Sequence, residues 1–352
     1  MDRPKIDIKN TYFDKELTKN EFVKLQQTIS HLFKESHKDF DKCLICGKDM
    51  KKPCDSHSLP KFILKQVASN GLIRSGNYFM WTKDHEKGVN NALLFRDICE
   101  ECDSAFFQEY ENPTYIEEKF SITAINEIAV KNLLRVIYKR TQERELFCNE
   151  YKKHPALALA NKIMICDLDI NSAKATLSKI IKHKQEKYYY IIDEFILPYQ
   201  TLLAFQGFVA LTKGFDGLIN NIYNFDPSYR IEELGICVFP YKGKTKIILF
   251  CLDGCTRMKL FYKKYRMLNL DEKLYVINYI ILLYTEEWVV PASFNKKQLN
   301  KETLLLINQT TDVYGMMSSL LMTEEEIHKE ELKQLDLKFS LQTSGNIYNF
   351  LK

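Results

Sequence analysis

The chain has 352 residues, with 50 lysines and arginines against 46 aspartates and glutamates, a net charge of +4 and a sequence pI of about 8.3. A balance so close to neutral identifies no partner by charge alone. No run approaches the ~18 apolar residues of a membrane span, and the N-terminal segment MDRPKIDIKN lacks the apolar core of a signal peptide. We therefore expect a cytoplasmic protein with no membrane partner.

The first half of the chain is helical by the spacing of its apolar residues. This spacing predicts an amphipathic helix over 19–36, a long helix over 122–146 and another helix over 171–185. A cysteine-rich segment separates the first two. We therefore predict an N-terminal helical arm over residues 1–40 and a metal-binding module over residues 41–112.

The second half is rich in β-branched and aromatic residues, a composition that predicts strands bounded by turn signals. The predicted strands cover 187–198, 205–212, 234–241 and 244–253. The last two are joined across Tyr241-Lys242-Gly243-Lys244, which indicates a hairpin. Helical patterns return at 271–286 and 323–335. The predicted fold class is α+β, with residues 113–352 forming a larger domain in which helices pack on an antiparallel sheet.

Two Cys-x-x-Cys pairs mark the module: Cys43-Leu-Ile-Cys46 and Cys99-Glu-Glu-Cys102. In a reducing compartment, paired cysteines indicate metal binding more often than disulfides. Four thiolates are the ligand set of a tetrahedral structural zinc site. Gly47 allows the tight turn of a zinc knuckle, and the sequence after Cys102 resembles a helix start. A knuckle followed by a helix that carries the second pair is the arrangement of a treble clef.

A rival ligand set remains open, because Cys54-x-x-His57 also has ligand spacing. That set would consist of Cys43, Cys46, Cys54 and His57. We favour the two Cys-x-x-Cys pairs, because the rival set gives Cys99 and Cys102 no role.

The segment between the pairs carries a resemblance to a known family. A first Cys-x-x-Cys, then His57-Ser-Leu-Pro60, then a Cys-x-x-Cys that opens a helix resembles the HNH (ββα-metal, zinc treble-clef) endonucleases over residues 43–111. The resemblance implies metal-dependent hydrolysis of phosphodiester bonds. His57 would be the general base, Asp103 would bind catalytic Mg²⁺ or Mn²⁺, and Asn91 would orient the histidine. Asn90 and Asn77 are alternatives to Asn91.

The chain departs from the family pattern just before the histidine. The family has a second metal ligand there, whereas this chain has Ser56, a poor ligand, with Asp55 one residue earlier as the substitute. Each assignment has a structural alternative. His57 could be a zinc ligand or a structural histidine, and Asp103 could be a first-turn carboxylate favoured by the helix dipole.

Nucleic acid, with DNA preferred, is the partner that the resemblance implies. Lys61, Lys65 and Arg74 are candidates to contact phosphates, although for each residue taken singly we favour solvated surface. The remainder of the chain resembles uncharacterised bacterial proteins associated with phage defence. The larger domain would recognise or regulate, and could contact a protein partner or a second copy. The alternative function is a non-catalytic treble-clef zinc protein that binds nucleic acid or a protein partner.

Overall fold

The structure is a computed structural model, and it describes residues 27, 31–32, 34–76, 86–222, 224, 226–309 and 341–352. Most of the predicted N-terminal arm, including most of the helix predicted over 19–36, lies outside the described residues. The helix predicted over 323–335 lies wholly outside them.

A four-stranded antiparallel sheet forms the centre of the molecule. Its order is β5 (Tyr189–Leu197), β8 (Lys244–Leu252), β7 (Leu234–Tyr241) and β6 (Phe205–Val209). The predicted hairpin is confirmed, because Tyr241 pairs with Lys244 across a turn in which Lys242 and Gly243 both have positive φ. Turns of this kind match the twist of the two strands that they join.

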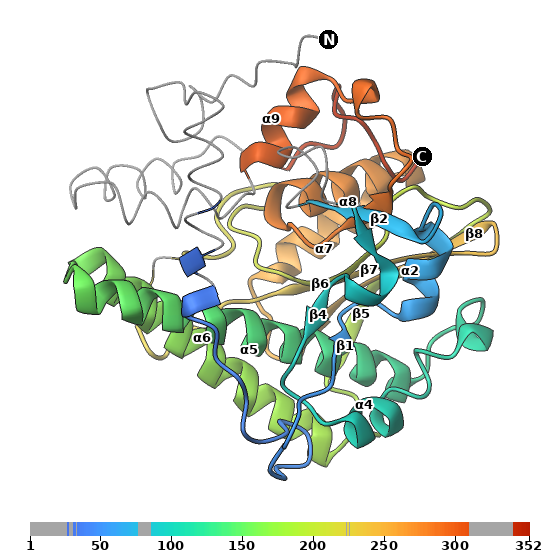
Figure 1. Cartoon of the computed structure of the whole chain (residues 1–352). Helices are drawn as coiled ribbons and strands as arrows, with labels where there is room; N and C mark the ends of the chain where they lie inside the picture. Colours follow the sequence, from blue (N-terminus) through green and yellow to red (C-terminus); the bar gives the residue numbers. More distant parts are fainter. Residues whose placement is uncertain are drawn as a thin grey trace.

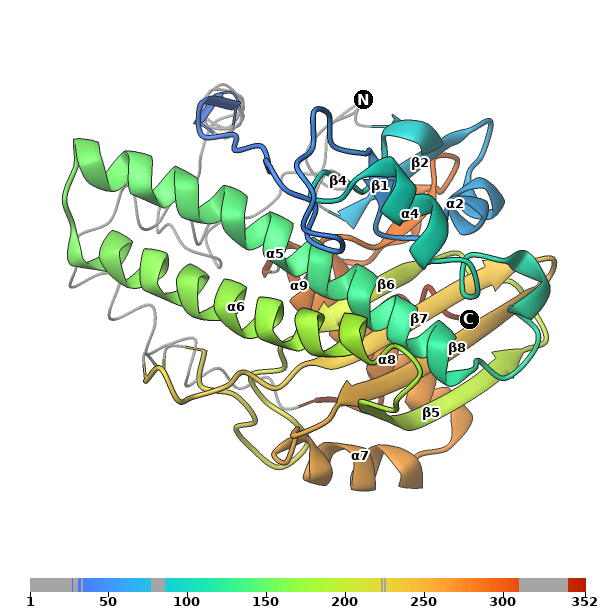
Figure 2. The ribbon, with the colours of Figure 1, turned by 90° about the horizontal axis from the view of Figure 1, so that it is seen from below.

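Each face of the sheet packs against helices (Figure 2). Successive side chains of a strand point to opposite faces. On one face, Val238 and Leu249 belong to a core shared with α7 (Met258–Met267) and α8 (Leu270–Tyr284). On the other face, Phe239 and Ile248 belong to a core shared with α5 and α6. The predicted α+β class with an antiparallel sheet and packed helices is therefore confirmed.

Helices α5 (Ile122–Lys153) and α6 (Leu157–Lys182) form a long antiparallel pair, visible in Figures 1 and 2. The Ser121 hydroxyl caps α5 by accepting a hydrogen bond from the Ala124 N–H. Ion pairs join the two helices: Arg140 Nε lies 2.8 Å from Asp169 Oδ2, and Arg144 Nε lies 2.6 Å from Asp167 Oδ1.

The cysteine module contains two antiparallel strands followed by a helix. β1 (Ser56–His57) pairs with β4 (Leu94–Phe95), and α4 (Glu100–Phe106) follows β4. The chain between the two strands forms an insert. Its described elements are α2 (Lys61–Val67), β2 (Leu72–Ser75), β3 (Lys87–Gly88) and the short 3₁₀ helix η2 (Val89–Asn91).

The insert joins the module to the C-terminal part of the chain. Its strand β2 pairs with β3 on one side and with β9 (Val289–Pro291) on the other. The shorter elements are η3 (Pro113–Tyr115), η4 (Lys296–Gln298) and α9 (Lys301–Gln309).

The core is continuous across the domain boundary predicted at residue 112. Phe95 and Ile98 of the module lie in the same buried cluster as Ile128 of α5 and Phe250 of β8. The module therefore packs against the rest of the chain through a shared hydrophobic core. The predicted domain boundaries stay a prediction. Among the helices that the structure describes, none is long and apolar enough to cross a bilayer.

Candidate zinc centre and the neighbouring histidine

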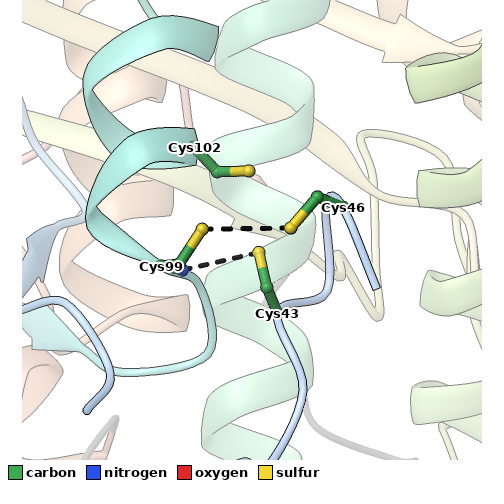
Figure 3. A group of neighbouring side chains, drawn as sticks. All are labelled: Cys43, Cys46, Cys99 and Cys102. Atoms are coloured by element: carbon green, nitrogen blue, oxygen red, sulfur yellow. Dashed lines mark hydrogen bonds between the residues drawn. The ribbon is translucent and has the colours of Figure 1, made fainter. Parts of the chain in front are cut away.

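The four predicted cysteines converge. The Sγ atoms of Cys43, Cys46, Cys99 and Cys102 all lie within 4.8 Å of one another, and those of Cys46 and Cys99 are 3.9 Å apart (Figure 3). In a tetrahedral site with Zn–S bonds of ~2.3 Å, two sulfurs are about 3.8 Å apart. The cluster is therefore consistent with a structural zinc site.

Backbone hydrogen bonds shape the knuckle that carries the first pair. The Cys43 N–H donates to the Lys48 carbonyl at 2.9 Å, and the Gly47 N–H donates to the Cys43 carbonyl at 2.8 Å. Gly47 has φ +71°, a conformation that glycine adopts without a steric penalty. The Leu44 N–H donates to the Asp97 carbonyl at 3.0 Å, which joins the knuckle to the segment before the second pair.

The electrostatics of the cluster suit a bound cation. A hydrogen bond from the Lys48 backbone lowers the pKa of Cys46 to about 7. The Cys99 N–H points at Cys43 Sγ from 3.4 Å. Burial raises the pKa of Cys99 and of Cys102, because the interior disfavours their thiolates. A zinc ion would supply the positive charge that stabilises all four thiolates and would release their protons on binding.

The rival ligand set is not brought together. Cys54 Sγ lies 3.7 Å from Asp103 Oδ2, and burial together with this carboxylate raises the pKa of Cys54 to about 12. The His57 ring is bonded elsewhere. Among the described residues, the four cysteines of the two pairs are the one group of three or more histidine, cysteine or carboxylate side chains close enough to share a metal.

His57 lies on β1, outside the cysteine cluster, and is half-buried. Its Nε2 is 3.0 Å from the Val89 carbonyl oxygen. Because a carbonyl can only accept, Nε2 carries the hydrogen and the lone pair is on Nδ1. Burial lowers the pKa of His57, and the charges of Lys61 and Lys131 act in the same direction. The imidazole is therefore neutral at neutral pH.

The partner of this histidine is a backbone group rather than an asparagine. Asn91 and Asn90 are exposed on η2, next to the Val89 carbonyl that receives the hydrogen bond. Asn77 lies outside the described residues. We expected η2 to orient His57 through an asparagine side chain, whereas η2 contacts His57 through a backbone carbonyl.

The two carboxylates predicted to bind a catalytic cation are engaged with different basic residues. Asp103 Oδ1 accepts from Ser56 Oγ at 2.5 Å and from Lys131 Nζ at 3.0 Å. Burial opposes ionisation of Asp103, but the Lys131 ammonium and the hydrogen bonds from Ser56 and Cys54 together outweigh it and lower the pKa of this carboxyl. Asp55 is exposed and forms an ion pair with Arg96. The structure therefore brings Asp103 to Ser56, and leaves Asp55 with Arg96.

The candidate phosphate contacts differ among themselves. Lys61 and Lys65 are exposed on α2. Arg74, in contrast, pairs with Glu86 at 2.6 Å and donates to the Phe294 carbonyl at 2.9 Å. The contact with Phe294 attaches β2 to the C-terminal part of the chain, and the contact with Glu86 lies within the insert.

Lys131 and Glu111 are functional candidates that sequence reasoning missed. Lys131 is three residues after Ile128 and three before Leu134, both fully buried, so it lies on the apolar face of α5. A lysine on an apolar helix face was the sequence signal that could have identified this residue.

Comparison of the chain with family models, with curated proteins and with solved structures gave no match.

Proposed function

We propose that this chain is a zinc-module nuclease that hydrolyses phosphodiester bonds in nucleic acid, with His57 as the general base. The observation that carries the proposal is the state of the imidazole: neutral, held through Nε2 by the Val89 carbonyl, with a lone pair on Nδ1. A second support is the succession of β1, β4 and α4 beside the four cysteines, which is the order of a ββα-metal treble clef.

In the proposed reaction, Nδ1 of His57 takes a proton from a water molecule. The water oxygen then bonds to phosphorus, the bond from phosphorus to the leaving oxygen breaks, and solvent returns a proton to that oxygen. Lys61 and Lys65 would hold the phosphate chain on the exposed face of α2. The catalytic Mg²⁺ or Mn²⁺, the preference for DNA and the role in phage defence stay predictions.

The test is a digestion of single- and double-stranded DNA and of RNA by the zinc-loaded protein, with Mg²⁺, with Mn²⁺ and with neither. His57→Ala should lower cutting by ~10²–10⁴-fold, because that is the usual contribution of a general base. His154→Ala is the matched control and should cut like the wild type, because His154 is an exposed histidine at the C-terminal end of α5, outside the module. Equal cutting by wild type and His57→Ala would place the activity elsewhere.

The pH dependence of cutting follows from the lowered pKa of His57. A protonated imidazole cannot accept a proton from water, so activity should be lost on acidification only below the ordinary histidine value of ~6.5. The contribution of His57 to the stability of the fold changes with pH in the same direction. It is present above the pKa of His57 in the unfolded chain and is lost as the pH falls through the pKa of His57 in the folded chain. An NMR titration of the His57 ring that gave a pKa at or above ~6.5 would contradict this.

The engaged carboxylates support a second candidate, a non-catalytic zinc module that binds nucleic acid or a protein. Asp103 is bonded to Lys131 and Asp55 to Arg96, so neither is free to bind a metal without first breaking an ion pair. This candidate predicts that labelled nucleic acid is retarded but not cut under any metal condition. Lys61→Ala combined with Lys65→Ala should then weaken retention and lessen its dependence on salt.

A further inference from the structure

Lys131 is a lysine enclosed by oxygen atoms in the interior of the molecule. Its side chain is 1% exposed. Its Nζ lies 3.0 Å from Asp103 Oδ1, 2.9 Å from Glu111 Oε1 and 3.1 Å from Ser56 Oγ. The centre of the Phe107 ring lies 3.8 Å away. These oxygens come from α4, from the chain after α4 and from β1, so one ammonium joins three parts of the module to α5.

The cage has the dimensions of an ammonium site. Separations of 2.9–3.1 Å are ordinary N–H···O distances, about 1 Å longer than the ~2.1 Å of a Mg²⁺–oxygen bond. An ammonium has three donors, and the cage presents one oxygen to each. The Phe107 ring covers another side and attracts the cation through its π face.

The charges explain why the lysine can be buried at all. Burying an unpaired ammonium is strongly unfavourable, whereas here two carboxylates face it. Without the ammonium, the half-buried carboxylates of Asp103 and Glu111 would face each other with no counter-charge between them. Their hard oxygens are the ligands that Mg²⁺ and Mn²⁺ prefer, and one divalent cation would neutralise both.

We propose that the Asp103–Glu111–Ser56 cage is a cation site that Lys131 fills permanently, and that removing this ammonium converts the cage into a site for Mg²⁺ or Mn²⁺. In the wild-type chain the Lys131 ammonium takes the place that the family resemblance gives to a divalent cation at Asp103, so a catalytic Mg²⁺ or Mn²⁺ would bind elsewhere. The inference deepens the proposed function, on which its catalytic meaning rests, but its test does not depend on cutting.

The experiment titrates the full-length, zinc-loaded chain with Mn²⁺, following free Mn²⁺ by electron paramagnetic resonance and the melting temperature in parallel. We expect the wild type to have no Mn²⁺ site that depends on Asp103, so Asp103→Asn should leave its Mn²⁺ binding unchanged. Lys131→Met keeps the length of the side chain and removes its charge. This variant should melt lower, gain one Mn²⁺ per chain and recover melting temperature as Mn²⁺ is added. The double variant Lys131→Met/Asp103→Asn should show neither the gain nor the recovery.

Two results would overturn the proposal. One is a wild-type Mn²⁺ site that Asp103→Asn removes, and the other is a folded Lys131→Met protein that gains no Mn²⁺. If Lys131→Met does not fold alone, it is refolded with and without Mn²⁺: recovery only with Mn²⁺ supports the proposal, and no recovery with either overturns it. A wild type that fails to cut nucleic acid would end the nuclease proposal and leave these metal results standing.

Discussion

The zinc module and the central sheet are stabilised in different ways, although both pack against α5. The strands β7 and β8 are buried along almost their whole length and are covered by helices on both faces. The module has two-residue strands, and its helix α4 has seven residues, none of them fully buried. Elements this short bury little apolar surface, so buried charge pairs, and on our proposal zinc ligation, replace part of the core.

Buried polar side chains of α5 accordingly contact the module. Glu127 is 1% exposed and accepts hydrogen bonds from the N–H groups of Glu109 and Tyr110, both at 3.0 Å. Lys184 lies 2.6 Å from the same carboxylate and donates to the Phe106 carbonyl, at the end of α4. Together with the ion pairs of Lys131, these contacts hold α4 against α5 by electrostatic attraction. Apolar side chains of the same helix, such as Ile128, belong to the buried cluster that the module and the sheet share.

The largest expected effect comes from removing zinc. Cys99→Ser, or treatment with a strong chelator, should leave the module without the free energy of zinc binding, which is ~10–16 kcal/mol in isolated zinc-finger peptides. Hydrogen exchange followed by mass spectrometry should show the loss of protection concentrated in residues 41–112. Peptides covering β7 and β8 should keep much of theirs.

The control for the zinc experiment is Cys148→Ser, which changes a half-buried cysteine outside the cluster and should retain zinc. Equal loss of protection in the module and in the sheet would show that the shared core makes the two regions a single cooperative unit. Elemental analysis that finds no zinc in protein prepared without chelator would refute the zinc assignment itself.

A smaller effect is expected when the sheet is weakened instead. Leu249 is fully buried on β8, so Leu249→Ala should lower the free energy of unfolding by ~2–5 kcal/mol through lost burial and the cavity left behind. Zinc content should stay unchanged. Leu260→Ala is the matched control, because Leu260 is 64% exposed on α7 and its truncation should change stability by less than ~0.5 kcal/mol. Denaturant unfolding measures both values.

The same contrast between regions explains how much of the fold the sequence predicts. The strand predicted over 234–241 coincides with β7, and its hairpin with β8 is confirmed, because a run of β-branched and aromatic residues and a local turn encode both. Each Cys-x-x-Cys pair is likewise identified from its local spacing, although the two pairs that converge are more than fifty residues apart. In each case, residues close together in sequence carry the information.

The features that were missed depend on distant partners. β2 is paired by β9, more than two hundred residues later, and neither strand has a strong pattern of its own. The prediction over 171–185 found only the second half of α6, because the first half includes Asp167 and Asp169, which pair with arginines of α5. The role of Lys131 likewise exists only once Asp103, Glu111 and Ser56 meet.

The smallest expected effect comes from one substitution made in both regions. Gly47 in the zinc knuckle has φ +71° and Gly243 in the sheet hairpin has φ +77°, and a Cβ at either position meets no atom within 4 Å. Gly47→Ala and Gly243→Ala therefore carry the same backbone penalty, ~1–2 kcal/mol for an L-residue in this conformation. With zinc in excess, the two variants should lose similar free energy of unfolding.

Competition with a chromogenic chelator should then separate the two variants. In Gly47→Ala the strain falls on the turn closed by the Gly47 N–H and the Cys43 carbonyl, so zinc should pass to the chelator more readily than from the wild type. Gly243→Ala should release zinc like the wild type, because its turn lies in the hairpin of β7 and β8. Faster release from both variants would mean that the sheet hairpin and the zinc site are coupled through their shared core.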